Sequence, residues 1–367
     1  MRRSIIQWVG VICAFATLGL AAAGGSLFSY IVLPANANNA RNSESAILRL
    51  RNGRLLLAWT EWYTPDARDG GPARISAMTS FDGGRSWRDK RVLQPNIGKL
   101  NVMEPNLLRL HSGKILFIFG RKNSDSDSSP MERISTDDAR TFSSPKTIPV
   151  VPYPSYTCFN NDRAIQLRSG RILLPVYYFK DISNDRPIRS RVYYSDDEGR
   201  TWKPSQTIVN VKESDVGVDE PGVVELKDGR LMLWARTSAG HPYQCYSSDG
   251  GETWTTPESM SVVAPNSPQS IKRVPSTGDL LMVWNNSPTE RFPLTTAISK
   301  DDGRTWQLVK SLDDDPAHTY AYTSITFVGD RVLFTYYAGP PAGADDSGLR
   351  AHWSLKLKSV PVRWLYE

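Results

Sequence analysis

The chain has 367 residues, of which 40% are hydrophobic and 22% charged, with a formal net charge of +6. These proportions exclude a disordered chain and a multispanning membrane protein, and the interspersed acids and bases give no indication of a nucleic-acid-binding surface. The 26 glycines, 25 prolines and many aromatic residues (11 Trp, 15 Tyr and 11 Phe) favour a turn-rich, all-β architecture.

The N-terminal segment predicts export. Two arginines precede an apolar run over residues 5–33, which is the pattern of a secretory signal. Ala35-Asn36-Ala37 has the small–any–small form of a signal-peptidase site. The run is also long enough to span a bilayer, so residues 1–37 are interpreted as a cleaved signal peptide or as a membrane anchor. Both interpretations place residues 38–367 outside the cytoplasm, as a periplasmic, secreted or outward-facing anchored domain.

Six segments share one template of a polar opening, an apolar strand, a Gly-centred turn and a second apolar strand. The first reads Glu44-Ser-Ala-Ile-Leu-Arg-Leu-Arg-Asn-Gly53-Arg-Leu-Leu-Leu-Ala-Trp59. The other five span residues 104–119, 161–177, 220–235, 269–284 and 322–337. Gly in these turns permits the positive φ that tight hairpins need. The second strands are nearly continuous apolar runs, so we expect them to be covered on both faces.

An eight-residue motif follows five of these six segments. Its first copy reads Ser80-Phe-Asp82-Gly-Gly84-Arg-Ser86-Trp87, and further copies begin at Ser135, Ser195, Ser247 and Ser299. This is the Asp box, S-x-D-x-G-x-[ST]-[WF]. We expect its Asp to accept hydrogen bonds from backbone N–H groups across the turn. Asp-x-Asp-x-Gly also opens calcium loops, but the spacing and closing Glu of an EF-hand are missing, so no metal or cofactor is predicted.

Six such units of four short strands predict a six-bladed β-propeller. The sixth unit lacks an Asp box, and residues 349–357 and 360–365 are expected to supply its outer strands. Because the first unit is complete from Glu44, we expect ring closure to need no exchanged strand, although the sequence leaves this open. Cys158 and Cys245 could form one disulfide or remain as two buried free thiols.

The first strand of each blade of a propeller lines the central channel, so the residues that open these strands converge on one mouth. Those residues are Glu44, Glu104, Asp162 with Arg163, Glu220, Gln269, and Tyr320 with Tyr322. For any single position, hydrogen bonding between neighbouring blades is an equally good interpretation. Together they predict a binding site for a polar ligand.

The Asp boxes and the segment from Asp219 to Arg236 (Asp-Glu-Pro-Gly-Val-Val-Glu-Leu-Lys-Asp-Gly-Arg-Leu-Met-Leu-Trp-Ala-Arg) resemble the sialidase (neuraminidase) superfamily. The resemblance covers essentially all of residues 44–367. Arg291-Phe-Pro-Leu-Thr295 is similar to the family's Arg-x-Asn-Leu-Thr segment, and Tyr322-Thr-Ser-Ile325 is similar to the Tyr-Ser-x-Leu segment that carries the nucleophile. Glu61 falls on a family Glu at the end of the second strand of the first blade.

The resemblance implies an exo-acting glycoside hydrolase for a terminal sugar, most simply an acidic one. In this scheme Arg236 and Arg291 would bind the substrate carboxylate. Tyr322 would attack the anomeric carbon, with Glu220 accepting its proton. A phenol suits an anionic sugar because a carboxylate nucleophile would be repelled by the charge of the substrate.

Two features depart from the family pattern. Family members open the first blade with an Arg that completes a carboxylate-binding triad, but Ser43-Glu44-Ser45 stands in that place. The family's acid/base Asp lies six residues before the first Asp-box Ser, where this chain has Arg74. Asp66 or Asp69 could supply the acid, and Arg163 could act as the third Arg. The substrate-binding residues expected beside the arginines are Glu104, Asp162, Glu61 and Gln269.

The leading interpretation is therefore an exported, monomeric, sialidase-like glycoside hydrolase that acts on a glycan or glycoconjugate. Membrane attachment would follow if the N-terminal segment is retained. The alternative is a carbohydrate-binding propeller without hydrolytic activity, because the proton donor is not where the family keeps it. A protein-interaction scaffold is a third possibility.

Overall fold

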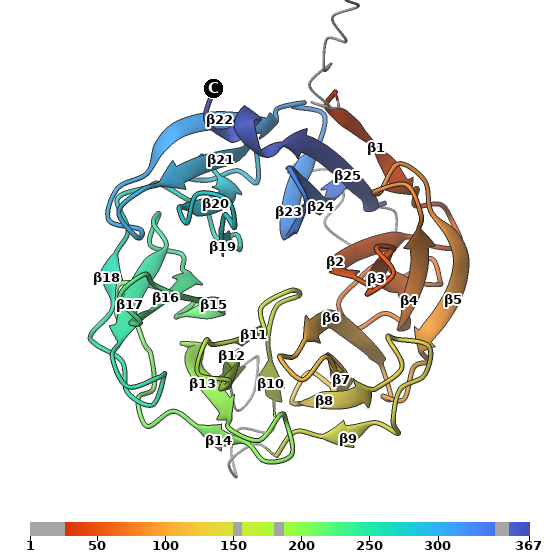
Figure 1. The fold of residues 1–367 in the computed structure, drawn as a ribbon, viewed down its shortest axis with the longest axis horizontal. Helices are drawn as coiled ribbons and strands as arrows, with labels where there is room; N and C mark the ends of the chain where they lie inside the picture. Colours follow the sequence, from red (N-terminus) through yellow and green to blue (C-terminus); the bar gives the residue numbers. More distant parts are fainter. Residues whose placement is uncertain (1–25, 150–155, 180–186, 342–351) are drawn as a thin grey trace, which may run out of the picture.

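A computed structural model describes residues 26–149, 156–179, 187–341 and 352–367. Within these ranges the regular structure consists of β-strands and one short 3-10 helix, η1 (Val362–Leu365), which confirms the all-β prediction. No helix in the described ranges is long and apolar enough to cross a membrane. The strands form a ring of small sheets that follow one another in chain order around a central axis (Figure 1).

The antiparallel pairings group the described strands into six units, which are the blades of the propeller. Single parallel bridges, Ala73–Asn101 and Ser128–Tyr156, join the first three blades into one continuous sheet. Blade one contains β2 (Arg41–Arg49), β3 (Leu55–Trp62), β4 (Ala73–Ser80) and β5 (Arg88–Gln94). Blade two contains β6 (Asn101–Arg109), β7 (Ile115–Ser124), β8 (Asp127–Ser135) and β9 (Lys146–Thr147). Blade three contains β10 (Tyr156–Cys158), β11 (Ile165–Gln166), β12 (Ile172–Phe179), β13 (Arg189–Ser195) and β14 (Lys203–Pro204).

The second half of the chain repeats this pattern. Blade four contains β15 (Asp219–Glu225), β16 (Leu231–Arg236), β17 (Tyr243–Ser247) and β18 (Glu258–Ser259). Blade five contains β19 (Ser270–Arg273), β20 (Leu280–Asn285), β21 (Leu294–Ser299) and β22 (Gln307–Asp313). Blade six contains β23 (Thr319–Val328), β24 (Arg331–Gly339), β25 (Ser354–Pro361) and β1 (Phe28–Leu33). The strands nearest the axis are β2, β6, β11, β15, β19 and β23 (Figure 1).

The ring is closed by a strand from the opposite end of the chain, which corrects the expectation that closure needs no exchanged strand. β1 pairs antiparallel with β25 and so covers the outer edge of blade six. The hydroxyl of Tyr30 in β1 also donates a 2.6 Å hydrogen bond to the carbonyl oxygen of Gly84 in blade one. Residues 28–33, expected to lie in the leader, therefore pair with the propeller.

Two further expectations concern the ends of the chain. Residues 362–365, expected in an outer strand, form the 3-10 helix η1 instead. Residues 1–25, which hold the basic start and most of the apolar run of the expected leader, and residues 349–351 lie outside the described ranges. Cleavage or retention of the leader therefore stays a prediction.

Each Asp box forms a closed hydrogen-bonded turn of the expected kind. In the first box, Asp82 Oδ1 accepts hydrogen bonds from the Ser86 backbone N–H at 2.9 Å and the Ser80 hydroxyl at 2.8 Å. The Ser80 hydroxyl oxygen also accepts the Gly84 N–H at 2.8 Å. Equivalent bonds form around Asp137, Asp197, Asp249 and Asp301. These donors outweigh partial burial and hold the pKa of Asp249 at about 2.

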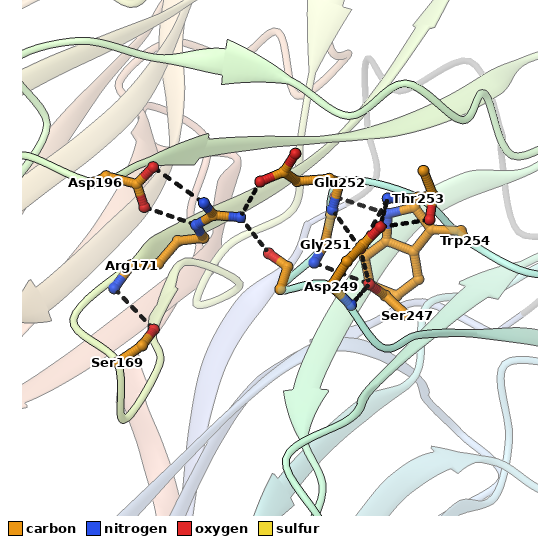
Figure 2. A network of polar contacts seen from close by, with 10 residues as sticks. Ser169, Arg171, Asp196, Ser247, Asp249, Gly251, Glu252, Thr253 and Trp254 are labelled. Atoms are coloured by element: carbon orange, nitrogen blue, oxygen red, sulfur yellow. Dashed lines mark hydrogen bonds and ion pairs between the residues drawn. The ribbon is translucent and has the colours of Figure 1, made fainter.

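The Asp boxes also tie neighbouring blades together. Figure 2 shows Arg171, beside the inner hairpin turn of blade three, between two acidic residues. Arg171 donates to Asp196 in its own blade at 2.7 Å and to Glu252, in the Asp box of blade four, at 3.0 Å. The Lys114–Glu198 ion pair at 2.8 Å joins blades two and three in the same way. The motif thus stabilises the ring as well as each turn.

The core of the protein lies between blades and within them. The strand β3 is buried along its whole length, as expected for a second strand covered on both faces. Cys158 and Cys245 are both buried free thiols, which resolves the two alternatives for them. Burial raises the pKa of each thiol to about 12.

Candidate active site

In five of the six blades, the inner segment has a non-glycine residue in the left-handed backbone region near its start. These residues are Glu44 (φ 44°), Glu104 (φ 62°), Asp162 (φ 57°), Glu220 (φ 46°) and Tyr322 (φ 59°). In four of the five blades the pairing register shifts at this point, as in a β-bulge. Such bulges redirect side chains, and strained residues of this kind gather at functional sites. In blade five the predicted residue Gln269 has no such conformation.

A cavity of about 740 Å³ lies at the mouth of the channel, where these strands begin. We call it the axial cavity. The residues that line it and could carry chemistry are Arg41, Asp69, Glu220, Arg236, Arg291 and Tyr322. These six residues come from four different blades, so the cavity forms only when the ring is closed.

Three guanidinium groups face the axial cavity. Arg236 ends β16, and its Nη1 donates to Glu220 Oε2 at 2.7 Å. Arg291 lies in the loop after β20, and its Nη1 donates to the Tyr337 hydroxyl at 2.9 Å. Asn266 links the two, because its Oδ1 accepts from Arg236 Nε at 2.5 Å and its backbone oxygen accepts from Arg291 Nη2 at 3.3 Å. The third guanidinium belongs to Arg41, at the start of β2.

The third guanidinium in the axial cavity is that of Arg41, and not that of Arg163, which was expected there. The Arg41 Cζ lies 4.1 Å from the centroid of the buried Trp62 ring, and its Nη1 donates to Asp69 Oδ1 at 2.6 Å. Its Nη2 bonds Glu44 Oε1. Sequence comparison missed Arg41 because it stands a few residues before Ser43-Glu44-Ser45, where the family Arg was sought, and the bulge at Glu44 shifts the register. An Arg at the first position of the first inner strand was the available signal.

Tyr322 and Glu220 share the axial cavity with these arginines. Burial raises the pKa of the Tyr322 phenol well above its usual value, and the Glu220 carboxylate raises it further. Arg291 and Arg236 lower it, and the Arg291 Cζ lies 5.8 Å from the Tyr322 ring centroid. No direct hydrogen bond joins the Tyr322 hydroxyl to Glu220 in the described part of the chain. The phenol therefore stays protonated at neutral pH and needs a base to become a nucleophile.

Of the two proposed acids, only Asp69 lines the axial cavity. Its side chain is 69% exposed, and its loop is held by Asn101, whose Nδ2 donates to the Asp69 carbonyl oxygen at 2.8 Å. Partial loss of hydration at the cavity mouth would raise the Asp69 pKa, but the nearby Arg41 guanidinium outweighs this effect and the pKa lies below its usual value. Asp66 is bound instead by the Arg68 side chain, at 2.8 Å and 2.9 Å. Asp66 lies outside the axial cavity, so Asp69 is the better placed of the two expected acids.

Three buried carboxyl groups in the axial cavity have an oxygen with no hydrogen-bond partner among the described residues: Glu44 Oε2, Glu104 Oε2 and Asp219 Oδ1. Burial, together with the charges of Glu44 and Glu220, raises the pKa of Glu104 well above its usual value. Burial raises the pKa of Asp219 to about 7, against the lowering effect of Arg236. These oxygens are available to hydroxyl or amide groups of a ligand. Glu104 was predicted as a substrate-binding residue, whereas Asp219 was not.

Four other predicted binding residues do not line this cavity. Glu61 accepts from Arg74 at 2.8 Å and Ser76 at 2.5 Å, so it joins strands within blade one. Gln269 donates to the Ser267 carbonyl oxygen at 2.6 Å. Asp162 and Arg163 reach across the channel to other blades. Neighbouring strands or other blades bind these four side chains, which explains why they lie outside the axial cavity. In the described ranges no group of three or more His, Cys, Asp or Glu could hold a metal ion.

Comparison with known proteins places this fold among sialidases. The family described as the BNR repeat-like domain matches residues 53–334. A sialidase from Micromonospora viridifaciens is 27% identical over 324 residues, which cover 77% of this chain and 47% of that protein. A sialidase from Bacteroides fragilis is 29% identical over 216 residues, covering 55% of this chain and 38% of that protein. This chain thus spans less than half of the length of these two relatives.

Solved structures show the same architecture. A protein of unknown function from Dyadobacter fermentans superimposes with a TM-score of 0.73 at 20% identity, covering 90% of this chain and 97% of that chain. The Trypanosoma rangeli sialidase superimposes with a TM-score of 0.72 at 16% identity, covering 91% of this chain and 59% of that chain. At these identities the similarity establishes the fold alone.

Proposed function

Because this chain belongs to the BNR repeat-like domain family of the sialidase superfamily, we propose that it is a glycoside hydrolase that releases a terminal acidic sugar from a glycoconjugate. The observation that carries the proposal is the meeting of Arg41, Arg236 and Arg291 with the Tyr322 phenol in one cavity. Three guanidiniums suit a carboxylate, which they can bind through paired hydrogen bonds.

Substrate binding would begin with the carboxylate. Arg291 has only neutral partners among the described residues, the Tyr337 hydroxyl and the Asn266 carbonyl oxygen, so its charge is free to attract an anion. Arg41 and Arg236 already pair with carboxylates of the protein, Asp69 and Glu220 respectively. The incoming carboxylate would share these two guanidiniums and thereby weaken their pairs. Asp69 would then regain a higher pKa, as an acid requires.

The bond-breaking step would follow the usual retaining scheme with a phenol as nucleophile. The Tyr322 oxygen attacks the anomeric carbon while its proton passes to Glu220. The bond from that carbon to the leaving oxygen breaks, and Asp69 protonates the leaving oxygen. Water then attacks the anomeric carbon of the glycosyl–Tyr322 aryl ether and gives a proton to Asp69, while Glu220 returns its proton to the departing Tyr322 oxygen. The 2.7 Å hydrogen bond from Arg236 Nη1 to Glu220 Oε2 supports this role, because it orients the carboxylate beside the axial cavity.

The proposal is tested with a panel of nitrophenyl glycosides that includes a sialoside. We expect turnover of an acidic glycoside by the wild type and a loss of about 1,000-fold or more in Tyr322→Phe. Tyr320→Phe is the matched control, because that hydroxyl donates to the Asp315 carbonyl oxygen outside the axial cavity. Full activity in Tyr322→Phe contradicts the mechanism. Binding of the sugar without turnover of any glycoside supports a carbohydrate-binding propeller instead.

Export is a further part of the proposal, supported by the basic and apolar N-terminal pattern. Because β1 belongs to blade six, we expect any cleavage to leave Phe28–Leu33 attached. N-terminal sequencing of the protein recovered from outside the cytoplasm tests this, and a mature chain that starts after Ala37 contradicts it.

A further inference from the structure

The inner strand of blade three is interrupted at the channel axis. β10 ends at Cys158 and β11 begins at Ile165. Between them, Asn161, Asp162 and Arg163 extend side chains across the channel to other blades. We call these three residues the axial clamp. Asn161 and Arg163 are buried, with 0% and 4% of their surfaces exposed.

All three clamp residues act on the segment of blade six that carries Tyr322. The Asn161 Nδ2 donates to the Tyr322 carbonyl oxygen at 3.2 Å, and also to the Ser45 carbonyl oxygen at 2.7 Å. One amide group therefore holds the bulges of blade one and blade six together. Both bulges carry residues of the axial cavity, Glu44 and Tyr322.

Asp162 binds the next residues of the same strand. Its Oδ2 accepts from the Ser324 hydroxyl at 2.7 Å and the Ile325 backbone N–H at 3.2 Å. Lys272 of blade five donates to the same Oδ2 at 2.7 Å and to the Ile325 carbonyl oxygen at 2.8 Å. Lys272 therefore binds both Asp162 and blade six, and ties the two together through blade five.

Arg163 reaches the strand through one intermediate. Its Nη1 donates to Ser270 Oγ at 3.1 Å, and the Ser270 hydroxyl donates to the Thr323 carbonyl oxygen at 2.5 Å. Its Nη2 donates to the Gln269 carbonyl oxygen at 2.6 Å. Together the three clamp residues are connected, directly or through Ser270, to four consecutive positions of blade six, residues 322–325.

Blade six needs these bonds because its own pairing fails at this point. In the β23–β24 ladder Ala321 pairs with Tyr337 and Ser324 with Thr335, and the register shifts between them. Tyr322 and Thr323 are left outside the ladder, with Tyr322 at a φ of 59°. A left-handed non-glycine residue persists only where the surroundings impose it. The clamp supplies partners for the carbonyl groups that the blade does not pair.

We propose that the axial clamp is a positioning device that holds the Tyr322 phenol at the distance and angle needed for attack. The proposal rests on the proposed hydrolase function for its kinetic consequence. Asn161, Asp162 and Arg163 touch no reacting atom in this scheme and act only through their bonds to residues 322–325. This role explains why blade three has polar residues at the start of its inner segment although residues 161–163 do not line the axial cavity.

The test compares Asp162→Ala with the conservative Asp162→Asn, which keeps an oxygen acceptor for Ser324 and Ile325. Misplacement of a reacting group by about 1 Å can cost about 100-fold in rate. We therefore expect kcat of Asp162→Ala to fall about 10- to 100-fold with KM changed less than about twofold. Asp162→Asn should recover most of the rate. Asn161→Ala, which removes no charge, should lower kcat in the same way if Asp162→Ala does not fold.

A second readout does not depend on turnover. Amide hydrogen exchange in the peptide that covers residues 320–326 should accelerate in Asp162→Ala and Asn161→Ala. Ser205→Ala is the control, since it removes a buried hydroxyl that bonds the Thr207 carbonyl oxygen in the outer part of blade three. It should lower stability without changing kcat or exchange at 320–326. Unchanged exchange and kcat in both clamp variants, or equal losses in the control, would overturn the proposal. If the wild type turns over no glycoside, the hydrolase proposal fails while the exchange experiment still decides the clamp.

Discussion

Substitution of Arg41 by Met separates the structural and functional roles of this residue. Arg41 is 8% exposed and binds Glu44, which is 1% exposed. Removal of one partner from a buried ion pair costs about 3–5 kcal/mol, because the other charge is left uncompensated. The second partner, Asp69, is mostly exposed and adds little to this cost. We expect Arg41→Met to lower the free energy of unfolding by about 3 kcal/mol at neutral pH.

The pH dependence of this loss follows from Glu44. Burial already raises the Glu44 pKa in the wild type, and Arg41 opposes the rise. Without Arg41 the folded-state pKa moves further above the unfolded value. A group of this kind favours folding below its unfolded pKa, and that contribution is lost as pH rises through the folded pKa. The destabilisation in Arg41→Met should therefore grow with increasing pH and be smallest near pH 4.

The double variant Arg41→Met/Glu44→Met should regain most of the stability, because neither buried charge remains. It should not regain activity, since the substrate carboxylate still lacks one guanidinium. Loss of that contact at about 3 kcal/mol corresponds to about a 100-fold fall in kcat/KM. Urea unfolding between pH 4 and 8 and steady-state kinetics on an acidic glycoside measure the two effects. Recovery of kcat/KM in the double variant, or an unchanged unfolding free energy in the single variant, would refute the reasoning.

Three further predictions follow from the fold. A chain that starts at residue 38 lacks β1, and so loses about 2–4 kcal/mol of apolar burial and exposes the edge of β25. It should unfold several degrees below a chain that starts at residue 26. Equal melting temperatures in calorimetry would contradict the role of β1 in ring closure. Asp249→Ala should lose about 1–2 kcal/mol at neutral pH, because its hydrogen bonds hold an Asp-box turn. The Asp249 pKa of about 2 means that its contribution is present above pH 4 and lost as pH falls toward 2, so the variant should show a shallower acid-induced loss of stability there. The Cys158 and Cys245 thiols, with pKa values of about 12, should not react with a thiol reagent at pH 8 until the protein is unfolded, and rapid labelling of the native protein contradicts their burial.

Features that depend only on residues close together in the chain could be predicted from the amino-acid sequence. The Asp box needs only eight consecutive residues to close its turn, so its repeated copies identified the repeating β unit. The openings of the inner strands were also visible, because a polar residue before an apolar run marks where each strand begins. Glu104, Glu220 and Tyr322 were selected in this way and lie in the axial cavity. The resemblance to the sialidase superfamily identified Arg236 and Arg291 as two further residues of the site, and both line the axial cavity.

Which distant residues come together in the axial cavity became clear only from the folded structure. The choice of Arg41 rather than Arg163, and of Asp69 rather than Asp66, depended on the bulge in β2 and on the loop that Asn101 holds. Ring closure by β1 joins residues more than 300 positions apart, as in the pairing of Phe28 with Ser359. Such contacts leave no periodic pattern, because each depends on how the whole ring closes. Local hydrogen bonds and strand periodicity are encoded in short windows, whereas a site on the axis is assembled from distant blades.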